Sequence, residues 1–320
     1  MATVAPRALI TGATGFVGRH LVAWLQQDTD WEIVALGTRR VEVAPGLTSI
    51  ACDLTDRAAV EAVLARYRPD YVFHLAARTS VPEAFAAPEA TLINNAVSQI
   101  TLFEAIRALG LNPVILVASS SEVYGAAPVD DMPLDEEQPF RPMNPYAVSK
   151  VVQDLLGLQY HLSHRMQVVR VRPFNHIGPG QSDRFVVASL ARQIAEAELG
   201  LGEPVVWVGN LDAQRDFLDV RDVVRAYRLV AQPEFAGEVF NVASGVPRSI
   251  REVLEGLVAL ARCRVEVRQD PARMRPSDIP VIFGSAAKLR LSTGWESRIP
   301  FERSLADTLD DWRARVAGRG

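Results

Sequence analysis

Short apolar runs alternate with amphipathic stretches through the first half of the chain. The runs have the length and apolar content of buried parallel strands, and they cover Arg7–Ile10, Glu32–Leu36, Tyr71–Leu75 and Val114–Ala118. Between them, apolar residues recur at helical spacing in Gly15–Gln27, Arg57–Arg66 and Pro88–Leu109. This alternation predicts right-handed βαβ crossovers and therefore an α/β fold with a doubly wound parallel sheet.

The pattern changes after Pro173. A helix over Asn144–Ser163 and a strand over Val168–Arg172 still follow the alternation, but Gly- and Pro-containing loops come next. These loops predict a second, smaller lobe of mixed α/β structure. A helix and strand within about residues 212–243 are expected to return to the first lobe, so residues 1–175 and 176–320 form two lobes that interleave in sequence.

Composition narrows the class of protein. The 320 residues are 48% apolar and 22% charged, with a net charge of −4 and no long basic run, which gives nucleic-acid binding little support. No apolar stretch approaches the ~20 residues of a membrane span, and the N-terminus does not resemble a secretory signal. Cys52 and Cys263 do not form a CxxC pair, so neither a disulfide framework nor a metal site is expected. We expect a soluble cytoplasmic protein.

A glycine-rich segment, TGATGFVGRHL, follows the first predicted strand directly. Gly12 permits a tight turn, Gly15 allows backbone amides to approach a pyrophosphate, and Gly18 allows close packing of the next helix on the sheet. The helix N-terminus adds a positive dipole end. This position between a strand and a helix predicts a Rossmann-like site for a dinucleotide.

The end of the second predicted strand bears on the choice of cofactor. An acidic residue there would bind a ribose 2′-hydroxyl, but this chain has Arg39 and Arg40, whose guanidinium groups suit a 2′-phosphate. NADP(H) is therefore the preferred cofactor, and NAD(H) stays possible because the pair can also be a solvated basic turn. Asp53 is expected either at the adenine edge or as the N-cap of the following helix.

The segment NPYAVSK places Tyr146 and Lys150 four residues apart, on one face of a predicted helix. A Tyr hydroxyl with a pKa near ~10 is a poor acid at neutral pH, but a neighbouring ammonium stabilises its phenolate. Ser120 ends the LVASS segment 26 residues before Tyr146, where it can hold a reacting oxygen. These three residues predict an acid–base site.

Together, the glycine motif, the HLAA segment at His74–Ala77, Ser120 and the YxxxK motif resemble the extended short-chain dehydrogenases/reductases, over nearly the whole chain. The resemblance implies that the smaller lobe, mainly residues 176–320, binds a sugar nucleotide as substrate. It also implies a homodimer formed through the Pro88–Leu109 and Asn144–Ser163 helices. It implies a structural role for His74 and a cofactor role for Asn95. The implied cofactor site comprises Gly12, Thr14, Gly15, Phe16, Val17, Arg39, Arg40, Asp53, Leu54, Leu75, Ala76, Ala77, Asn95, Tyr146 and Lys150.

The second half is similar to enzymes that make deoxysugars from GDP-mannose. Three segments carry the likeness: Arg172–Gln181, Gln214–Asp222 and Arg275–Trp295. They are most similar to the GDP-4-keto-6-deoxy-D-mannose reductases, which make GDP-D-rhamnose with NADPH. By this resemblance Asn175 and Arg215 contact the diphosphate, Arg275 and Asp278 contact the nucleotide end, and Ser121 belongs to the substrate site.

Two other functions stay open. Dehydratases of the same family carry a Glu two residues after the catalytic hydroxyl, and Glu122 occupies that position, so a GDP-mannose 4,6-dehydratase or another nucleotide-sugar epimerase or dehydratase is the alternative. The FNHIGPGQ loop favours the reductase. A cofactor-binding regulator without turnover is a remote alternative, because such proteins typically lose the Tyr or Lys that this chain retains.

Overall fold

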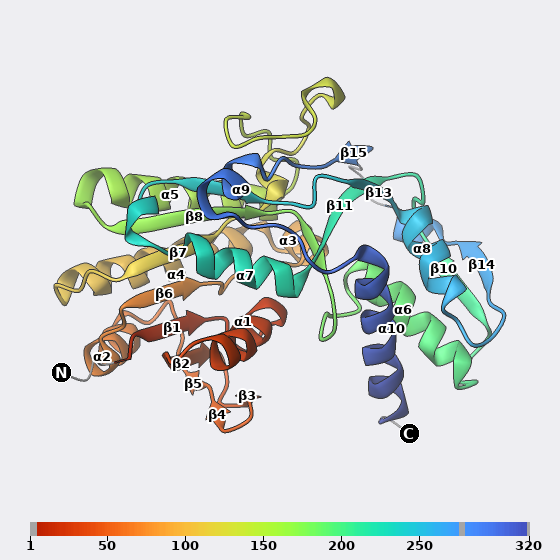
Figure 1. Cartoon of the computed structure of the whole chain (residues 1–320), viewed down its shortest axis with the longest axis horizontal. Coiled ribbons are helices and arrows are strands. Elements are labelled where there is room, and N and C mark those ends of the chain that lie inside the picture. The colour runs from red at the N-terminus through yellow and green to blue at the C-terminus, as the bar shows by residue number, and fades with distance from the viewer. Residues whose placement is uncertain (1–4, 275–278, 319–320) are drawn as a thin grey trace.

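The fold is built on a parallel sheet of seven strands in the order β12-β8-β7-β6-β1-β2-β5 (Figure 1). The computed structural model describes residues 5–274 and 279–318. Strand order reverses on either side of β1, and doubly wound sheets bind ligands beyond the carboxyl ends of their strands at this point. The strands are β1 (Arg7–Thr11), β2 (Glu32–Gly37), β5 (Ile50–Ala51), β6 (Tyr71–His74), β7 (Val114–Ala118), β8 (Gln167–Pro173) and β12 (Val239–Val242). The predicted doubly wound fold is confirmed.

Helices cover both faces of this sheet, and a separate apolar core lies under each layer. One core packs side chains of α1 (Phe16–Asp28), α7 (Val220–Val230) and α9 (Ala287–Thr293) against the sheet. The other uses α2 (Arg57–Tyr67), α4 (Pro88–Ala108) and α5 (Pro145–His164). The strands are buried on both faces, which explains why their sequences are continuously apolar rather than alternating.

A second lobe, drawn at the right of Figure 1, has its own apolar core. Its helices are α6 (Val186–Glu198), α8 (Ile250–Ala259) and α10 (Phe301–Ala317), beside a two-stranded sheet of β10 (Val205–Val208) and β14 (Glu266–Gln269). A further small sheet joins β9 (Asn175–Ile177), β11 (Gln214–Asp219), β13 (Pro247–Ser249) and β15 (Val281–Ile282). The remaining elements are short: α3 (Val81–Ala86), β3 (Glu42–Ala44), β4 (Leu47–Thr48) and the 3₁₀ turns Ser121–Val123, Val129–Asp131, Pro233–Phe235 and Pro271–Arg273.

The chain returns from the second lobe to complete the large sheet. β11 runs directly into α7, which packs beside α1, and β12 then pairs in parallel with β8, Val239 opposite Arg170. Phe240 and Val242 of β12 are buried in the core beneath α1 and α7. The edge of the large sheet is therefore built from residues far along the chain.

A buried ion cluster fixes α5 to β8. The Asp154 carboxylate accepts hydrogen bonds from Arg170 Nη1 at 2.9 Å and from Arg172 Nε at 2.9 Å. Asp154 is fully buried and both arginines are nearly so. Arg172 also donates to the Tyr124 hydroxyl at 3.0 Å. Because α5 carries Tyr146 and Lys150, this cluster sets how the helix that bears these two residues lies on the sheet.

Candidate active site

The loop between β1 and α1 forms a tight cradle at the carboxyl edge of the sheet. Gly12 has a φ of 70°, in the left-handed region that favours glycine, and a Cβ on Gly18 would lie 2.3 Å from the Gly12 carbonyl oxygen. Gly15 precedes α1 and supplies no side-chain cap to it. The first N–H groups of α1 can therefore receive an anion, and this cradle fits the pyrophosphate of a dinucleotide.

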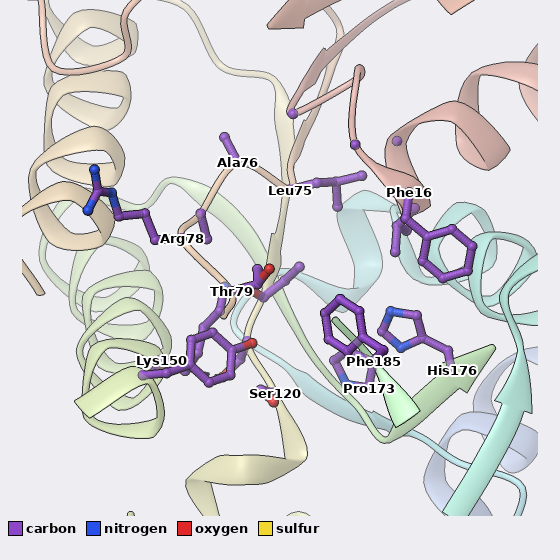
Figure 2. A pocket seen from close by; sticks show the side chains of 18 of the residues that line it. Phe16, Leu75, Ala76, Arg78, Thr79, Ser120, Lys150, Pro173, His176 and Phe185 are labelled. Atoms are coloured by element: carbon purple, nitrogen blue, oxygen red, sulfur yellow. Dashed lines mark hydrogen bonds between the residues drawn. The ribbon is translucent and has the colours of Figure 1, made fainter. Parts of the chain in front are cut away.

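A cavity of about 630 Å³ opens beside this cradle. Figure 2 shows Ser120 and Lys150 on one side of it, with Phe16, His176 and Phe185 on the other. The cavity brings together most of the residues predicted from the sequence. Its lining includes Gly12, Thr14, Gly15, Phe16, Val17, Asp53, Leu54, Leu75, Ala76 and Ala77, as well as Ser120, Ser121, Glu122, Tyr146, Lys150 and Asn175.

Tyr146 and Ser120 both line this cavity. Tyr146 lies in the first turn of α5, which the Asn144 side chain caps by accepting from the Ala147 N–H at 2.8 Å. Burial raises the pKa of Tyr146 above its usual value, the neighbouring Ser120 hydroxyl lowers it in part, and the charge of Glu122 raises it again. The phenol therefore holds its proton, as a proton donor must.

Lys150 points to two neutral acceptors. Its Nζ donates to the Ala118 carbonyl at 2.8 Å and to Gln153 Oε1 at 2.9 Å, and it lies 5.9 Å from the centre of the Tyr146 ring. Burial lowers the pKa of Lys150 to about 7. The sequence predicted that Lys150 would bring the pKa of Tyr146 down. The structure differs here, because burial dominates that pKa and the ammonium is held by other partners.

Glu122 is held in a fixed position at the same end of the cavity. Its Oε2 accepts from Asn144 Nδ2 at 2.9 Å, and its backbone N–H donates to the Ser120 hydroxyl at 3.2 Å. The turn after β7 and the start of α5 are therefore joined through one carboxylate. The site thus holds a phenol and a carboxylate, one suited to donate a proton and the other able to accept one.

Two of the predicted cofactor contacts lie beside the cavity rather than in its lining. Arg39 and Arg40 are exposed in the turn after β2, next to the lining residue Thr38. Asp53 does line the cavity, and its Oδ1 accepts from the backbone N–H and hydroxyl of Thr55. The alternative that Asp53 caps the next helix is wrong, because that N-cap is Asp56.

Asn95 and Arg215 are placed differently from expectation. Asn95 is fully buried behind the cavity wall, where its side chain bonds the backbone N–H and carbonyl of Arg78 and the Ser149 hydroxyl; its neighbour Asn94 lines the cavity instead. Asn95 thus fastens the loop after β6 to α5. Arg215 lies outside the cavity lining, and its Nη1 donates to the Gln214 and Ile279 carbonyls. Arg275 and Asp278 lie outside the described residues.

Of the aromatic wall opposite Ser120, sequence reasoning predicted Phe16 but missed His176 and Phe185. Phe16 stacks on His176 with ring centroids 5.9 Å apart and planes at 9°, and Phe185 lines the same wall. His176 follows Asn175 directly, so its position beside a predicted contact was the available signal. Gln153 was also missed, because a glutamine inside a helical pattern carries no motif.

His74 lies buried behind the site, as expected of a structural residue. Its Nδ1 is 3.0 Å from the Thr11 hydroxyl, and burial lowers the pKa of His74 to about 3, with a further contribution from the Lys150 charge.

Within residues 5–274 and 279–318, no group of three or more His, Cys, Asp or Glu side chains could hold a metal ion. No helix in the same part of the chain is long and apolar enough to cross a membrane.

Comparison with known proteins places these features among sugar-nucleotide enzymes. The sequence model of the GDP-mannose 4,6-dehydratase family matches residues 9–308. The chain is 42% identical to a GDP-6-deoxy-D-mannose reductase of Pseudomonas aeruginosa, over 97% of this chain and 98% of that protein. Two solved structures cover nearly the whole fold. RMD from Pseudomonas aeruginosa in complex with NADPH has a TM-score of 0.88 and 40% identity, covering 97% of this chain and 100% of that one. The Thermus thermophilus UDP-glucose 4-epimerase in complex with NAD has a TM-score of 0.86 and 29% identity, covering 96% and 99%.

Proposed function

Because the chain belongs to the GDP-mannose 4,6-dehydratase family of extended short-chain dehydrogenases/reductases, we propose that it reduces GDP-4-keto-6-deoxy-D-mannose to GDP-D-rhamnose. The observation that carries this proposal is the 42% identity to a GDP-6-deoxy-D-mannose reductase over almost the full length of both proteins. The cavity supports it, because a ketone reductase needs a proton donor beside a group that holds the carbonyl oxygen, and Tyr146 and Ser120 both line the cavity.

In the proposed mechanism, NADPH when bound supplies a hydride to carbon 4 of the keto sugar. The residues of the chain handle the oxygen and its proton. Ser120 donates a hydrogen bond to the carbonyl oxygen, and Tyr146 gives its proton to the oxygen as negative charge develops on it. Lys150 supplies positive charge next to the Tyr146 phenol as the phenol loses its proton. Phe16, at the start of α1, helps to exclude water from this wall of the cavity.

The cofactor and substrate contacts follow the two sides of the site. The Gly12–Val17 cradle holds the pyrophosphate, and Arg39 and Arg40 select the 2′-phosphate of NADP(H). Binding of NADPH to the related RMD supports this preference, while the NAD in the related epimerase keeps NAD(H) as an alternative. For the GDP-sugar we propose Ser121 and Asn175, which line the cavity. Arg215, Arg275 and Asp278 stay proposed contacts for the diphosphate and nucleotide end.

A GDP-mannose 4,6-dehydratase is the second candidate, and Glu122 favours it. Loss of water from the sugar needs a base that takes the proton at carbon 5, and a carboxylate in the cavity beside Tyr146 can serve. Reduction of an existing ketone needs no such base. The two reactions therefore make different demands on Glu122.

The decisive experiment incubates the purified protein and Glu122→Gln separately with GDP-mannose plus NADP⁺ and with the 4-keto-6-deoxy sugar plus NADPH. Products are identified by mass spectrometry, and NADPH oxidation is followed by absorbance. We expect rapid NADPH oxidation with the keto sugar, little water loss from GDP-mannose, and only a modest effect of Glu122→Gln. Rapid conversion of GDP-mannose that disappears in Glu122→Gln would show a dehydratase instead.

We also propose a homodimer formed through α4 and α5. These helices pack side by side, and each leaves large apolar side chains exposed: Leu92, Ile93 and Ile100 on α4, and Val148, Leu155 and Leu162 on α5. Apolar side chains that gather on one surface mark association sites. Light scattering should give twice the monomer mass, and Leu155→Glu together with Leu162→Glu should give the monomer mass.

The two lobes divide the work in this proposal. Residues 1–175, with the return segment near 212–243, hold the cofactor, and most of 176–320 holds the sugar nucleotide. Separate apolar cores support the division. Cys52 and Cys263 are both free, which fits a reducing compartment such as the cytoplasm.

A further inference from the structure

Among the described residues, Gln153 provides the one side chain that accepts a hydrogen bond from the Lys150 ammonium. Its Oε1 accepts from Lys150 Nζ at 2.9 Å, and the other acceptor is the backbone carbonyl of Ala118 at 2.8 Å. Lys150 and Gln153 are three residues apart on α5, so they share one face of the helix. Both side chains are buried. The position of the ammonium therefore depends on a neutral amide.

No carboxylate balances the Lys150 charge within the described residues. Asp154 lies on α5 four residues after Lys150, but both of its oxygens accept hydrogen bonds from Arg170 and Arg172 of β8. Two other titratable groups face Lys150. His74 on β6 is neutral, because burial lowers its pKa to about 3. Tyr146, on the same helix as Lys150, holds its proton. The Ser119 hydroxyl, directly after β7, donates to the Lys150 backbone carbonyl at 3.4 Å and brings no charge.

A buried ammonium without a counter-charge is stabilised only by oriented dipoles. The two acceptors here engage two of its three N–H donors, and Lys150 also lines the cavity, so the third can reach a ligand. We propose that Gln153 is a positioning residue that keeps Lys150 charged and aimed at the cavity during turnover. The proposal rests on the proposed reductase only in its effect on turnover, because the Lys150–Gln153 contact exists without substrate.

The sequence offers a direct measurement. Lys150 and Lys288 are the only lysines in the chain. Protein labelled with ¹³C and ¹⁵N in lysine alone therefore gives two side-chain signals, and Lys288→Arg assigns them while keeping a cation opposite Glu238. Titration of the Lys150 signal with pH reports its pKa in the full chain, with the Lys288 signal as an internal sign of intact folding.

Two variants move the pKa of Lys150 in opposite directions. Gln153→Leu removes the acceptor, so the pKa should fall by roughly one unit or more; Gln153→Glu supplies a carboxylate, so it should rise by a similar amount. Gln99→Leu is the matched control. Gln99 is an equally buried glutamine among the described residues, and its side chain donates to the backbone carbonyl of Gln153 at 2.8 Å but makes no hydrogen bond to Lys150. Its replacement should leave the Lys150 titration unchanged.

The pH dependence of kcat should follow the titration. Because we expect the charged form of Lys150 to be the active one, kcat falls as pH rises through the Lys150 pKa. This alkaline limb of the pH profile should move to lower pH in Gln153→Leu and to higher pH in Gln153→Glu. A purely structural role would lower activity without moving the limb. An unchanged Lys150 pKa in folded Gln153→Glu, or an equal shift in Gln99→Leu, would overturn the proposal. If Gln153→Leu does not fold, Gln153→Glu alone decides it. Failure of the reductase assignment would leave the NMR result intact.

Discussion

Replacing Asp154 with Asn removes one negative charge from the centre of the molecule and changes no volume. In the native protein both carboxylate oxygens accept from Arg170 and Arg172, at 2.9 to 3.2 Å. The Asn side chain keeps one acceptor and turns an NH₂ group toward a guanidinium that has only donors to offer. Two buried arginines then lack a counter-charge.

Breaking a buried ion pair from one side costs about 3–5 kcal/mol, because the remaining charge stays desolvated. Unfolding by urea, followed by far-UV circular dichroism, measures this loss. With a slope near ~3 kcal/mol/M for a chain of this size, the urea midpoint should fall by roughly 1 to 1.7 M. Glu61→Gln, which removes the partner of the exposed Arg57, is the control and should leave the midpoint in place.

The effect should also depend on pH in a defined direction. Burial pushes the pKa of Asp154 upward, but Arg172 and Arg170 outweigh burial and hold that pKa below its usual value. The folded pKa is thus depressed, so the stabilisation is complete above the unfolded value near ~3.9 and is lost as pH falls through the folded value. The difference between the two proteins should be constant above about pH 5 and shrink below pH 4. A loss under 1 kcal/mol at pH 7, or a difference that grows in acid, would refute this account of the cluster.

Three further predictions concern the cavity. Tyr146→Phe should lower kcat by ~10²–10⁴-fold, because only the transferable proton is removed, while NADPH affinity measured by fluorescence stays nearly unchanged; near-native turnover would exclude Tyr146 as the acid. Replacing both Arg39 and Arg40 with Ala should reduce the preference for NADPH over NADH by at least ~10-fold in dissociation constants, and equal weakening of both would refute their role. Gly18→Ala should abolish NADPH binding by isothermal calorimetry, since its Cβ would meet the Gly12 carbonyl at 2.3 Å; unaltered binding would show that the cradle is not used.

The sequence predicted most of the large sheet because its signals are local. Buried parallel strands are apolar on both faces, so the four strands predicted first differ from β1, β2, β6 and β7 by at most one residue at an end. The glycine cradle was predictable for the same reason, since Gly12 and Gly18 follow a strand in sequence. The small strands β9, β13 and β15 have no such pattern, because each is two or three residues long and depends on distant partners.

Site residues were predictable where the helix or strand that carries a side chain also decides its position. They were missed where a contact with a distant segment decides it. Ser120 and Tyr146 sit at the ends of β7 and α5 that face the cavity, so position in the element was enough. The sequence could not show that the Asn95 amide holds the loop after β6 rather than lining the cavity, because only tertiary structure brings that loop against α4. The prediction that Lys150 lowers the pKa of Tyr146 was wrong, because burial dominates that pKa and no sequence motif reports burial.

The late arrival of β12 has a consequence for synthesis of the protein. The β8 edge, with its buried apolar side chains, has no neighbour until residues Val239–Val242 leave the ribosome and pair with it. An open, apolar strand edge invites pairing with other chains, so the nascent protein depends on protection during the interval in which residues 174–238 are made. Cutting the gene near residue 175 would then separate the sheet from its last strand, and neither half would form a cofactor-binding module by itself.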